Sequence, residues 1–320
     1  MFISGKNPLS KQHPPAANPY QSPPSAETVR DREIGVALQH ADSPLYQPVL
    51  WRLAWREQRV LLISLCVLLA VFGVIYVWLV SRVKLDGLSA FLMNTFKDFE
   101  SLSGVPFKDV ATISGRIALG FIDPVVLLTM TTWAISRGSD LISGELDRGT
   151  MELTLAQPLR RMSFFLAKTA LSLVGVVGLA LSFWGGSSLG IVLVHTPADN
   201  VSGWQFWPGV INIIALGFMI LGVSSAMSSW DRYRWRTVGI MGGCYATWLL
   251  FKILFKMGGE PWYWIGWLTP FRWFEPQLLI RETGDWGLQL GYNGMLLLIG
   301  TAGYVIAAVV FTKRDLPAPL

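Results

Sequence analysis

One segment restricts the fold of this chain more than any other. VLLISLCVLLAVFGVIYVWLV, residues 60–80, contains no charged residue. A helix of about 20 apolar residues spans the hydrocarbon core of a bilayer. Because lipid offers no hydrogen bonds, a spanning segment must satisfy its own backbone groups, and a helix does so internally. The segment therefore predicts a transmembrane helix.

Further apolar segments of similar length predict five more spans. The chain is 52% hydrophobic and 15% charged, which is too apolar for an ordinary soluble domain, and its 15 Trp suit a membrane interface. Asp123-Pro124 interrupts the second span, and Pro124 is expected to kink it. We predict an all-α membrane protein whose further spans are residues 117–136, 169–194, 207–227, 238–257 and 288–311.

Basic residues indicate the orientation of these spans. Six crossings place both termini on one side, and that side carries thirteen Arg and Lys against seven on the other. The positive-inside rule then makes both termini cytoplasmic. The membrane we expect is the cytoplasmic (inner) membrane of a bacterium. The formal charge of +5 does not indicate a nucleic-acid partner, because the basic residues flank apolar segments and form no continuous stripe.

Four regions are expected along the chain. Residues 1–48 are polar and Pro/Ser-rich, which predicts a disordered cytoplasmic tail. Residues 49–59 place Trp51 and Trp55 among Arg52, Arg56 and Arg59, which predicts an amphipathic helix in contact with membrane lipid. Alternatively, residues 49–59 extend the first span into the cytoplasm. Residues 60–311 form the transmembrane domain, and residues 312–320 form a short cytoplasmic tail.

The stretch ELDRGTMELTLAQPLRR, residues 145–161, gathers charge between two apolar spans. Ser139 and Asp140 can cap a first short helix, which Gly149 ends in a left-handed conformation. Thr150 can cap a second helix, which Pro158 ends. Both helices are too short to be stable alone, so they need a surface to dock on. The alternative is a polar loop that only connects two spans.

This stretch resembles the signature of type-2 ABC exporter permeases, in which a Glu precedes Gly-Thr-Leu-Glu-Leu-Leu-Leu, a small residue, Pro and Arg. Met151 and Thr154 stand where Leu is usual. LTPFRWFEPQLLI, residues 268–280, is similar to a second stretch of the family, Ser-Pro-Phe-x-Tyr-Phe-Asp-Pro, in the outer loop before the last span. The resemblance covers about residues 49–320, and its first motif is carried by Glu145, Gly149, Thr150, Glu152, Leu153, Leu155, Pro158 and Arg161.

The resemblance implies a permease that moves a substrate with ATP hydrolysed by a separate ABC ATP-binding subunit. The chain has no G-x-x-x-x-G-K-[ST] motif, so ATP and Mg are expected in that partner and no cofactor in this chain. Six spans imply half a transporter, completed as a homodimer or a heterodimer with a second permease. The expected coupling helix between spans 2 and 3 would contact the ATP-binding subunit through Glu145, Arg148, Gly149, Thr150, Glu152, Leu153, Pro158 and Arg161.

The loop before the last span, GGEPWYWIGWLTPFRWFEP, is rich in aromatic residues and broken by proline. This composition predicts short helices that dip into the outer interface as a re-entrant segment. An aromatic belt that only anchors the loop is the alternative. The family resemblance implies an outer gate formed by Trp267, Pro270, Phe271, Trp273, Phe274 and Pro276.

Three charged residues fall inside predicted spans. Asp123 lies roughly 10 Å from the outer end of the second span, and Lys252 lies roughly 20 Å from the inner end of the fifth. In a core of about 30 Å these depths coincide. Lys256 lies one turn beyond Lys252 on the same face. Because charges in a membrane are usually paired or face a cavity, we expect an Asp123–Lys252 ion pair or a polar substrate path.

An intramembrane hydrolase and a membrane scaffold are the two other classes of function to consider. An intramembrane hydrolase would need a nucleophile with a base, two carboxylates at membrane depth, or a metal cluster. The chain has only His13, His40 and His195, and Asp123 is the one acid deep in a span, so we expect neither catalytic residues nor a metal site. A non-transporting membrane scaffold or assembly factor remains the alternative function. No motif specifies a substrate.

Overall fold

The structure is a computed structural model that describes residues 48–82, 112–149, 161–194, 201–258 and 260–313. All regular elements in these residues are helices. Six are long and apolar enough to cross a membrane, counting α6 to α7 as one span. The six spans are α2 (Pro48–Arg82), α6 (Ile113–Leu119) with η1 (Gly120–Ile122) and α7 (Pro124–Asp140), α10 (Arg161–Val194), α11 (Trp207–Trp230), α12 (Arg234–Met257) and α14 (Trp286–Lys313).

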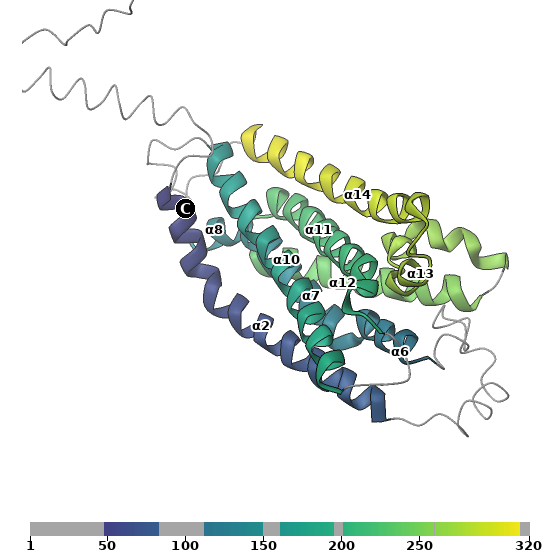
Figure 1. Cartoon of the computed structure of the whole chain (residues 1–320). Helices are drawn as coiled ribbons and strands as arrows, with labels where there is room; N and C mark the ends of the chain where they lie inside the picture. Colours follow the sequence, from purple (N-terminus) through teal and green to yellow (C-terminus); the bar gives the residue numbers. More distant parts are fainter. Residues whose placement is uncertain (1–47, 83–111, 150–160, 195–200, 259, 314–320) are drawn as a thin grey trace, which may run out of the picture. The chain divides into compact units, whose positions relative to one another are not determined.

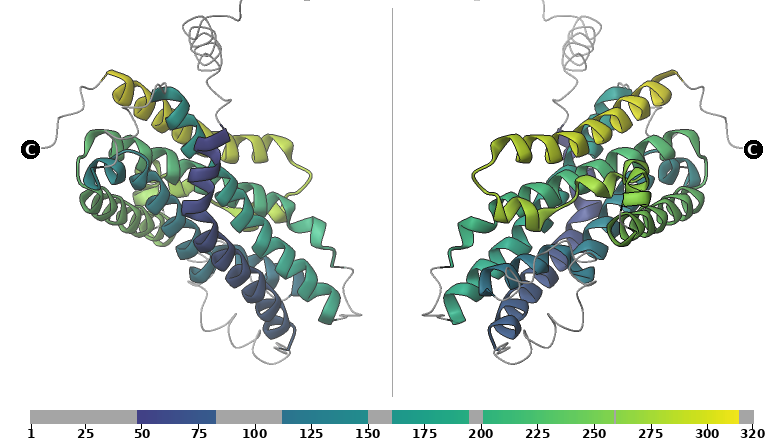
Figure 2. Two further views of the ribbon diagram at one scale, coloured as in Figure 1. Left: turned by 90° about the vertical axis from the view of Figure 1, so that its left-hand side faces the viewer. Right: turned by 90° about the vertical axis from the view of Figure 1, so that its right-hand side faces the viewer.

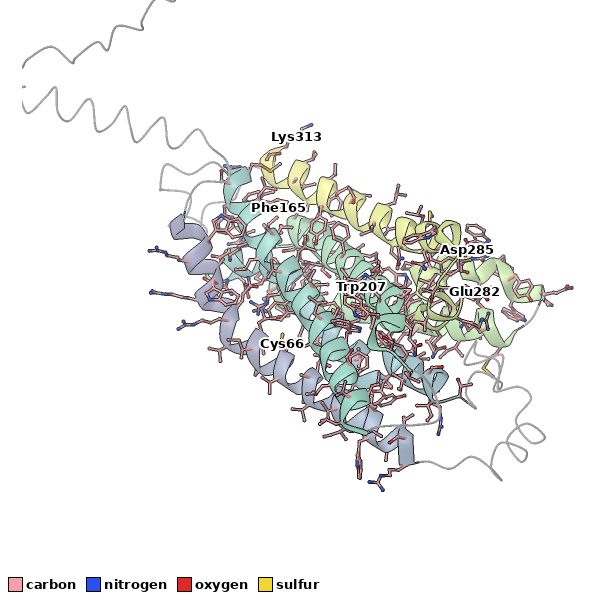
Figure 3. The ribbon with its side chains drawn as sticks, viewed as in Figure 1. Cys66, Phe165, Trp207, Glu282, Asp285 and Lys313 are labelled. Atoms are coloured by element: carbon pink, nitrogen blue, oxygen red, sulfur yellow. The ribbon has the colours of Figure 1, made fainter. Side chains whose placement is uncertain are left out.

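Short helices connect the spans at the two ends of the bundle. The α8 end carries α8 (Ser143–Asp147), between α7 and α10. The α13 end carries η2 (Gly203–Phe206), η3 (Glu260–Leu268), η4 (Pro270–Trp273) and α13 (Pro276–Arg281). Lys313 at the end of α14 therefore lies far from Glu282 and Asp285, which follow α13 (Figure 3). The short helices predicted for the aromatic loop are confirmed, but its insertion into a membrane stays a prediction.

The second span is broken rather than kinked. α6 and η1 end at Asp123, whose ψ of 137° leaves the helical region. The Asp123 carboxylate accepts a hydrogen bond from the N–H of Val125 at 2.8 Å, and Pro124 occupies the first turn of α7. Proline is tolerated there because its missing N–H would have no partner within the helix. Asp123-Pro124 therefore starts a new helix inside the span.

The first span is one continuous helix through the boundary expected at residues 59 and 60. Residues 49–59 are thus continuous with the span, as the alternative prediction had it, and the described part of the chain begins within this helix, at Pro48. Arg56 and Arg59 are exposed on this extension, whereas Gln58 is buried. Whether the extension lies against lipid headgroups stays a prediction. The predicted tail of residues 1–48 lies almost wholly outside the described residues.

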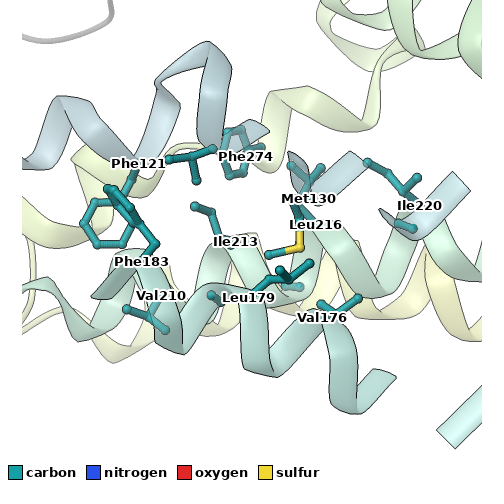
Figure 4. Packing of buried hydrophobic residues seen from close by; sticks show 14 of the residues in the cluster. Phe121, Met130, Val176, Leu179, Phe183, Val210, Ile213, Leu216, Ile220 and Phe274 are labelled. Carbon is teal, nitrogen blue, oxygen red and sulfur yellow. The ribbon is translucent and has the colours of Figure 1, made fainter. Parts of the chain in front are cut away.

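The core is formed where α7, α10 and α11 meet (Figure 4). Met130 of α7, Val176 and Leu179 of α10, and Ile213 and Leu216 of α11 are buried there with at most 1% of their surface exposed. Toward the α13 end the same cluster includes aromatic rings, such as Phe121 against Phe183 at 5.1 Å between centroids. These contacts fix the two halves of the broken second span against the bundle.

Glycines allow two pairs of helices to touch at the backbone. A Cβ at Gly186 would overlap the backbone of Ala70 where α10 packs along α2. A Cβ at Gly222 would overlap Gly300 where α11 packs along α14. Small residues are the usual way for helices to approach closely in a membrane. Consequently α10 runs along α2, and α11 runs along α14 (Figures 1 and 2).

α12 is the least covered span. Of its most apolar 18-residue window 6% is buried, compared with 72% for α11. Gly239, Gly242 and Gly243 face open space, with no atom within 4 Å of an added Cβ. One long side of α12 is therefore available for lipid or for a second protein chain.

Candidate functional site

The charged segment after the second span begins with α8, which is packed into the bundle. Ser143, Gly144 and Glu145 are buried, whereas Asp147 is exposed. Gly149 has a φ of +69°, the left-handed conformation expected to end this helix. α8 therefore anchors the segment at its N-terminal turn and leaves its C-terminal end on the surface.

The start of α8 is capped from another helix, so the prediction for Ser139 and Asp140 is wrong. α7 continues through both residues, and Ile142, which directly precedes α8, has no side chain able to cap. Instead, Ser228 Oγ of α11 accepts hydrogen bonds from the N–H groups of Ile142 at 3.2 Å and Ser143 at 2.8 Å. Helix N-termini leave such N–H groups unsatisfied, and here a neighbouring hydroxyl satisfies two of them.

We expect Ser228→Ala to loosen the junction between α7 and α8. The change leaves two buried N–H groups without an acceptor, which lowers the local opening free energy by about 2 kcal/mol. Hydrogen exchange of the Ile142 and Ser143 amides in detergent measures this. Ser225→Ala is the matched control, because Ser225 Oγ is equally buried and donates to Leu221 O in its own helix. Equal exchange in the two variants would contradict the role of Ser228.

Glu145 is the centre of a buried charge network. Glu145 has 5% of its surface exposed, and its carboxylate pairs with Lys168 of α10, which has 7% of its surface exposed. Arg148 donates to the same Glu145 oxygen at 3.0 Å. Lys168 also lies 3.8 Å from a carboxylate oxygen of Glu57 in α2. Glu145 thus joins α8 to α10 and, through Lys168, to α2.

Asp140 is the second carboxylate of the network. Its Oδ1 accepts from Arg148 Nη1 at 2.8 Å and lies 3.4 Å from Arg234 Nη1 at the start of α12. Arg234 also donates to Ser136 Oγ at 3.1 Å. Burial disfavours the charged form of Arg148, but its hydrogen bonds and charge interactions with Asp140 and Glu145 outweigh this and raise the pKa of its guanidinium.

The network connects five helices, α2, α7, α8, α10 and α12, at one end of the bundle. A buried ion pair does little for net stability, but removing one partner leaves an uncompensated charge and costs about 3–5 kcal/mol. The arrangement therefore fixes the position of α8 more than it strengthens the fold. These ion pairs connect α8 directly to α10, and to α12 through Arg148 and Asp140.

The predicted coupling residues are only partly described. Glu145, Arg148 and Gly149 lie on or directly after α8, and Arg161 is the first residue of α10. Glu145 is buried and pairs with Lys168, and its contact with a partner subunit stays a prediction. The second short helix expected from Thr150, and with it Glu152, Leu153, Leu155 and Pro158, lies outside the described residues.

Sequence reasoning missed four members of this site: Glu57, Lys168, Arg234 and Ser228. In the sequence analysis Lys168 and Arg234 are only two of the thirteen basic residues that indicate the cytoplasmic side. The usable signal was a lysine one to two turns inside an apolar helix, close in sequence to a charged loop, since a charge there usually has a partner. A single Ser in an apolar helix gives no comparable signal.

At the α13 end, Glu275 holds two lysines of α12. Its Oε1 lies 3.2 Å from Lys252 Nζ and 2.8 Å from Lys256 Nζ. Lys252 also donates to the carbonyl oxygen of Phe274 at 2.5 Å. The expectation that Lys252 and Lys256 share a helix face is confirmed. All three side chains are at most 16% exposed, so this is a second buried charge cluster.

The expected pair of Asp123 with Lys252 is wrong. Asp123 caps α7, and Lys252 takes Glu275 instead. The depth estimate placed both residues at the same level, but depth alone does not fix which helix faces meet. Glu275 belongs to the loop that we predict on the outer side. In the structure this loop folds back against α12, which brings Glu275 to Lys252 and Lys256.

The residues predicted for an outer gate fall into two groups. Phe271 and Phe274 are buried in the core with at most 1% exposure, and Phe271 packs against Tyr245 of α12 at 5.5 Å between ring centroids. Trp267 is 66% exposed and lies 6.0 Å from Trp273. Pro270 and Pro276 each occupy the first turn of a short helix, η4 and α13. The segment from η4 to α13 is therefore held in the bundle by the buried rings of Phe271 and Phe274.

Fold and site together define a class: a polytopic helical membrane protein with a short charged helix anchored at one end. The chain belongs to the ABC-2 family of transporter proteins, because the family model described as "ABC-2 family transporter protein" matches residues 51–316. No curated protein matches the chain. The resemblance to type-2 ABC permeases is therefore confirmed, and the family provides membrane permease components that are not themselves catalytic.

Proposed function

We propose that this chain is the permease subunit of an exporter-type ABC transporter. It moves a substrate, whose identity no motif specifies, across the cytoplasmic membrane, and a separate subunit hydrolyses ATP. The family match supports the membrane component. The observation that carries the proposal is the anchored α8. Its buried Glu145 binds Lys168 of α10, and Arg148 at its end binds Asp140 of α7, which also holds Arg234 of α12, so movement of α8 would displace spanning helices.

The partner is an ABC ATP-binding subunit, which supplies the site for ATP and Mg. It contacts the exposed end of α8 at Arg148 and Gly149, and the coupling residues expected in the following segment, Thr150, Glu152, Leu153 and Pro158, which lie outside the described residues. Arg148 suits this position, because 44% of its side chain is exposed while its guanidinium holds both carboxylates of the network. The α8 end is then cytoplasmic, and both termini lie on that side, as the distribution of Arg and Lys predicts.

A second permease, identical or related, completes the transporter. The uncovered side of α12, with Gly239, Gly242 and Gly243 open, is the surface that supports this. The segment from η3 to α13 then acts as the outer gate at the opposite end. Lys252 and Lys256 hold this segment against α12 through their ion pairs with Glu275, and they do not line an open polar path.

Gly149→Pro is the test of coupling. Proline cannot adopt a φ of +69°, and it removes the N–H that bonds Leu146 O at 3.1 Å, so the chain after α8 must change direction. We expect the variant to insert and fold normally but to lose most substrate-dependent stimulation of ATP hydrolysis in the reconstituted transporter.

Gly149→Asn is the matched control, because Asn tolerates the left-handed conformation and nothing lies within 4 Å of the new Cβ. It should keep stimulation near the wild-type level. Cysteine cross-linking at Thr150 or Glu152 should capture the ATP-binding subunit. Normal stimulation in Gly149→Pro would refute the coupling role, and capture of no ATP-binding subunit would refute the proposed function.

A further inference from the structure

A groove between α2 and α10 at the α13 end is not used by the proposed transport mechanism. It has a volume of about 490 Å³. Val74, Ile75 and Trp78 of α2 form one wall, and Leu193 and Val194 of α10 form the other. Gly190 lies at its base, where a side chain would press on Val74 and Val77. The lining of the groove is therefore mostly apolar, and Gly190 allows α10 to approach α2 closely at its base.

Arg82 stands at the mouth of this groove, at the last residue of α2. Its guanidinium lies 5.5 Å from the centroid of the Trp78 ring. Within the described part of the chain Arg82 forms no salt bridge, in contrast to Arg148 and Arg234 at the α8 end. The N–H groups of Arg82 are thus available for an anion, and Ser81 beside it adds a hydroxyl to the rim.

The position of the groove limits its ligand. α2 is a spanning helix, Arg82 ends it, and Trp78 is 51% exposed one turn earlier, as expected at the level of lipid headgroups. An apolar groove on the side of a spanning helix faces acyl chains. An arginine at its mouth binds phosphate through paired N–H groups.

We propose that this groove is a binding site for an anionic phospholipid. One acyl chain lies along Val74, Gly190 and Leu193, and the phosphate accepts hydrogen bonds from Arg82, whose guanidinium is held over Trp78. The site depends neither on the direction of transport nor on the ATP-binding subunit. It would tie α2 to α10 by lipid at the end where glycines already bring the two helices together.

Native mass spectrometry of the full chain tests the proposal. The protein is released from nanodiscs of phosphatidylcholine and phosphatidylglycerol in equal amounts. We expect the wild type to retain phosphatidylglycerol in preference to phosphatidylcholine. Arg82→Gln should lower this preference about fivefold, the effect of one cation near an anionic surface. Arg281→Gln is the matched control, because Arg281 lies at the same end of the bundle, outside the groove, and pairs with Glu282 at 3.2 Å.

Two further measurements make the result decisive. A photoreactive phosphatidylglycerol should label peptides of α2 and α10 around Leu193, and Arg82→Gln should reduce that labelling. Millimolar glycerol phosphate should not compete, because it lacks the acyl chain. Retention of both lipids in the bulk ratio, an equal loss in Arg281→Gln, or displacement by glycerol phosphate would each overturn the proposal.

Discussion

Glu145→Ala is expected to lower the free energy of unfolding by about 3–5 kcal/mol, because it leaves the Lys168 ammonium buried without its closest carboxylate. The next carboxylate, Glu57, lies 3.8 Å away and is 39% exposed, so it compensates poorly. Unfolding of the purified chain in mixed micelles by increasing denaturing detergent measures the change. Glu145→Lys should be worse, since it places a third cation between Lys168 and Arg148.

Asp147→Ala is the control for this experiment. Asp147 is an acidic residue of the same helix, but it is exposed, so we expect a change within about 0.5 kcal/mol. The double variant Glu145→Leu with Lys168→Met should recover most of the lost stability, because it removes both charges and leaves an apolar contact. A double variant no more stable than Glu145→Ala would show that the pair is not what holds α8.

This experiment also separates anchoring from coupling. If the charge network transmits movement from α8, the double variant should fold well and still stimulate ATP hydrolysis poorly, since α8 is no longer tied to α10 by charge. A double variant with normal stimulation would limit the role of the network to folding. Gly149→Pro remains the cleaner test of docking, because Gly149 lies outside the buried network.

The spanning helices could be predicted closely from the sequence because their signal is local. A run of about 20 apolar residues must be a helix in lipid, wherever the rest of the chain lies. Predicted spans such as residues 60–80 and 288–311 fall inside α2 and α14. The sequence also indicated an interruption at Asp123-Pro124. That Asp123 caps a new helix there became clear only from the structure, in which its carboxylate accepts from the N–H of Val125.

The partners of the buried charges could not be predicted in the same way. Lys252 and Lys256 are four residues apart, so helical geometry gave their shared face. Which carboxylate they meet depends on how residues 260–281 fold back, which no periodicity encodes. Lys168 and Glu145 are similarly brought together by the way α8 packs against α7, α11 and α12, beside the start of α10. The sequence therefore identified the charged segment at 145–161, but it did not indicate that Glu145 is buried against Lys168.

Glu275→Ala is expected to have the largest effect at the α13 end. Glu275 is the single carboxylate between Lys252 and Lys256 in the described residues, so its removal leaves two buried ammonium groups facing each other. We expect a loss of about 3–5 kcal/mol in unfolding free energy, measured in the same mixed micelles. Lys252→Met should cost clearly less, because Glu275 then keeps Lys256 and the remaining pair is neutral.

A surface ion pair of the same region provides the control for Glu275. Arg281 and Glu282 lie 3.2 Å apart with 39% and 51% of their side chains exposed, and such pairs contribute about 0–1 kcal/mol. Glu282→Ala should therefore change stability little. Because Glu275 precedes α13 and its lysines belong to α12, Glu275→Ala should also speed hydrogen exchange in residues 270–281. If Lys252→Met proved as damaging as Glu275→Ala, the cluster would not be held by its one carboxylate, and the segment would depend on Phe271 and Phe274 alone.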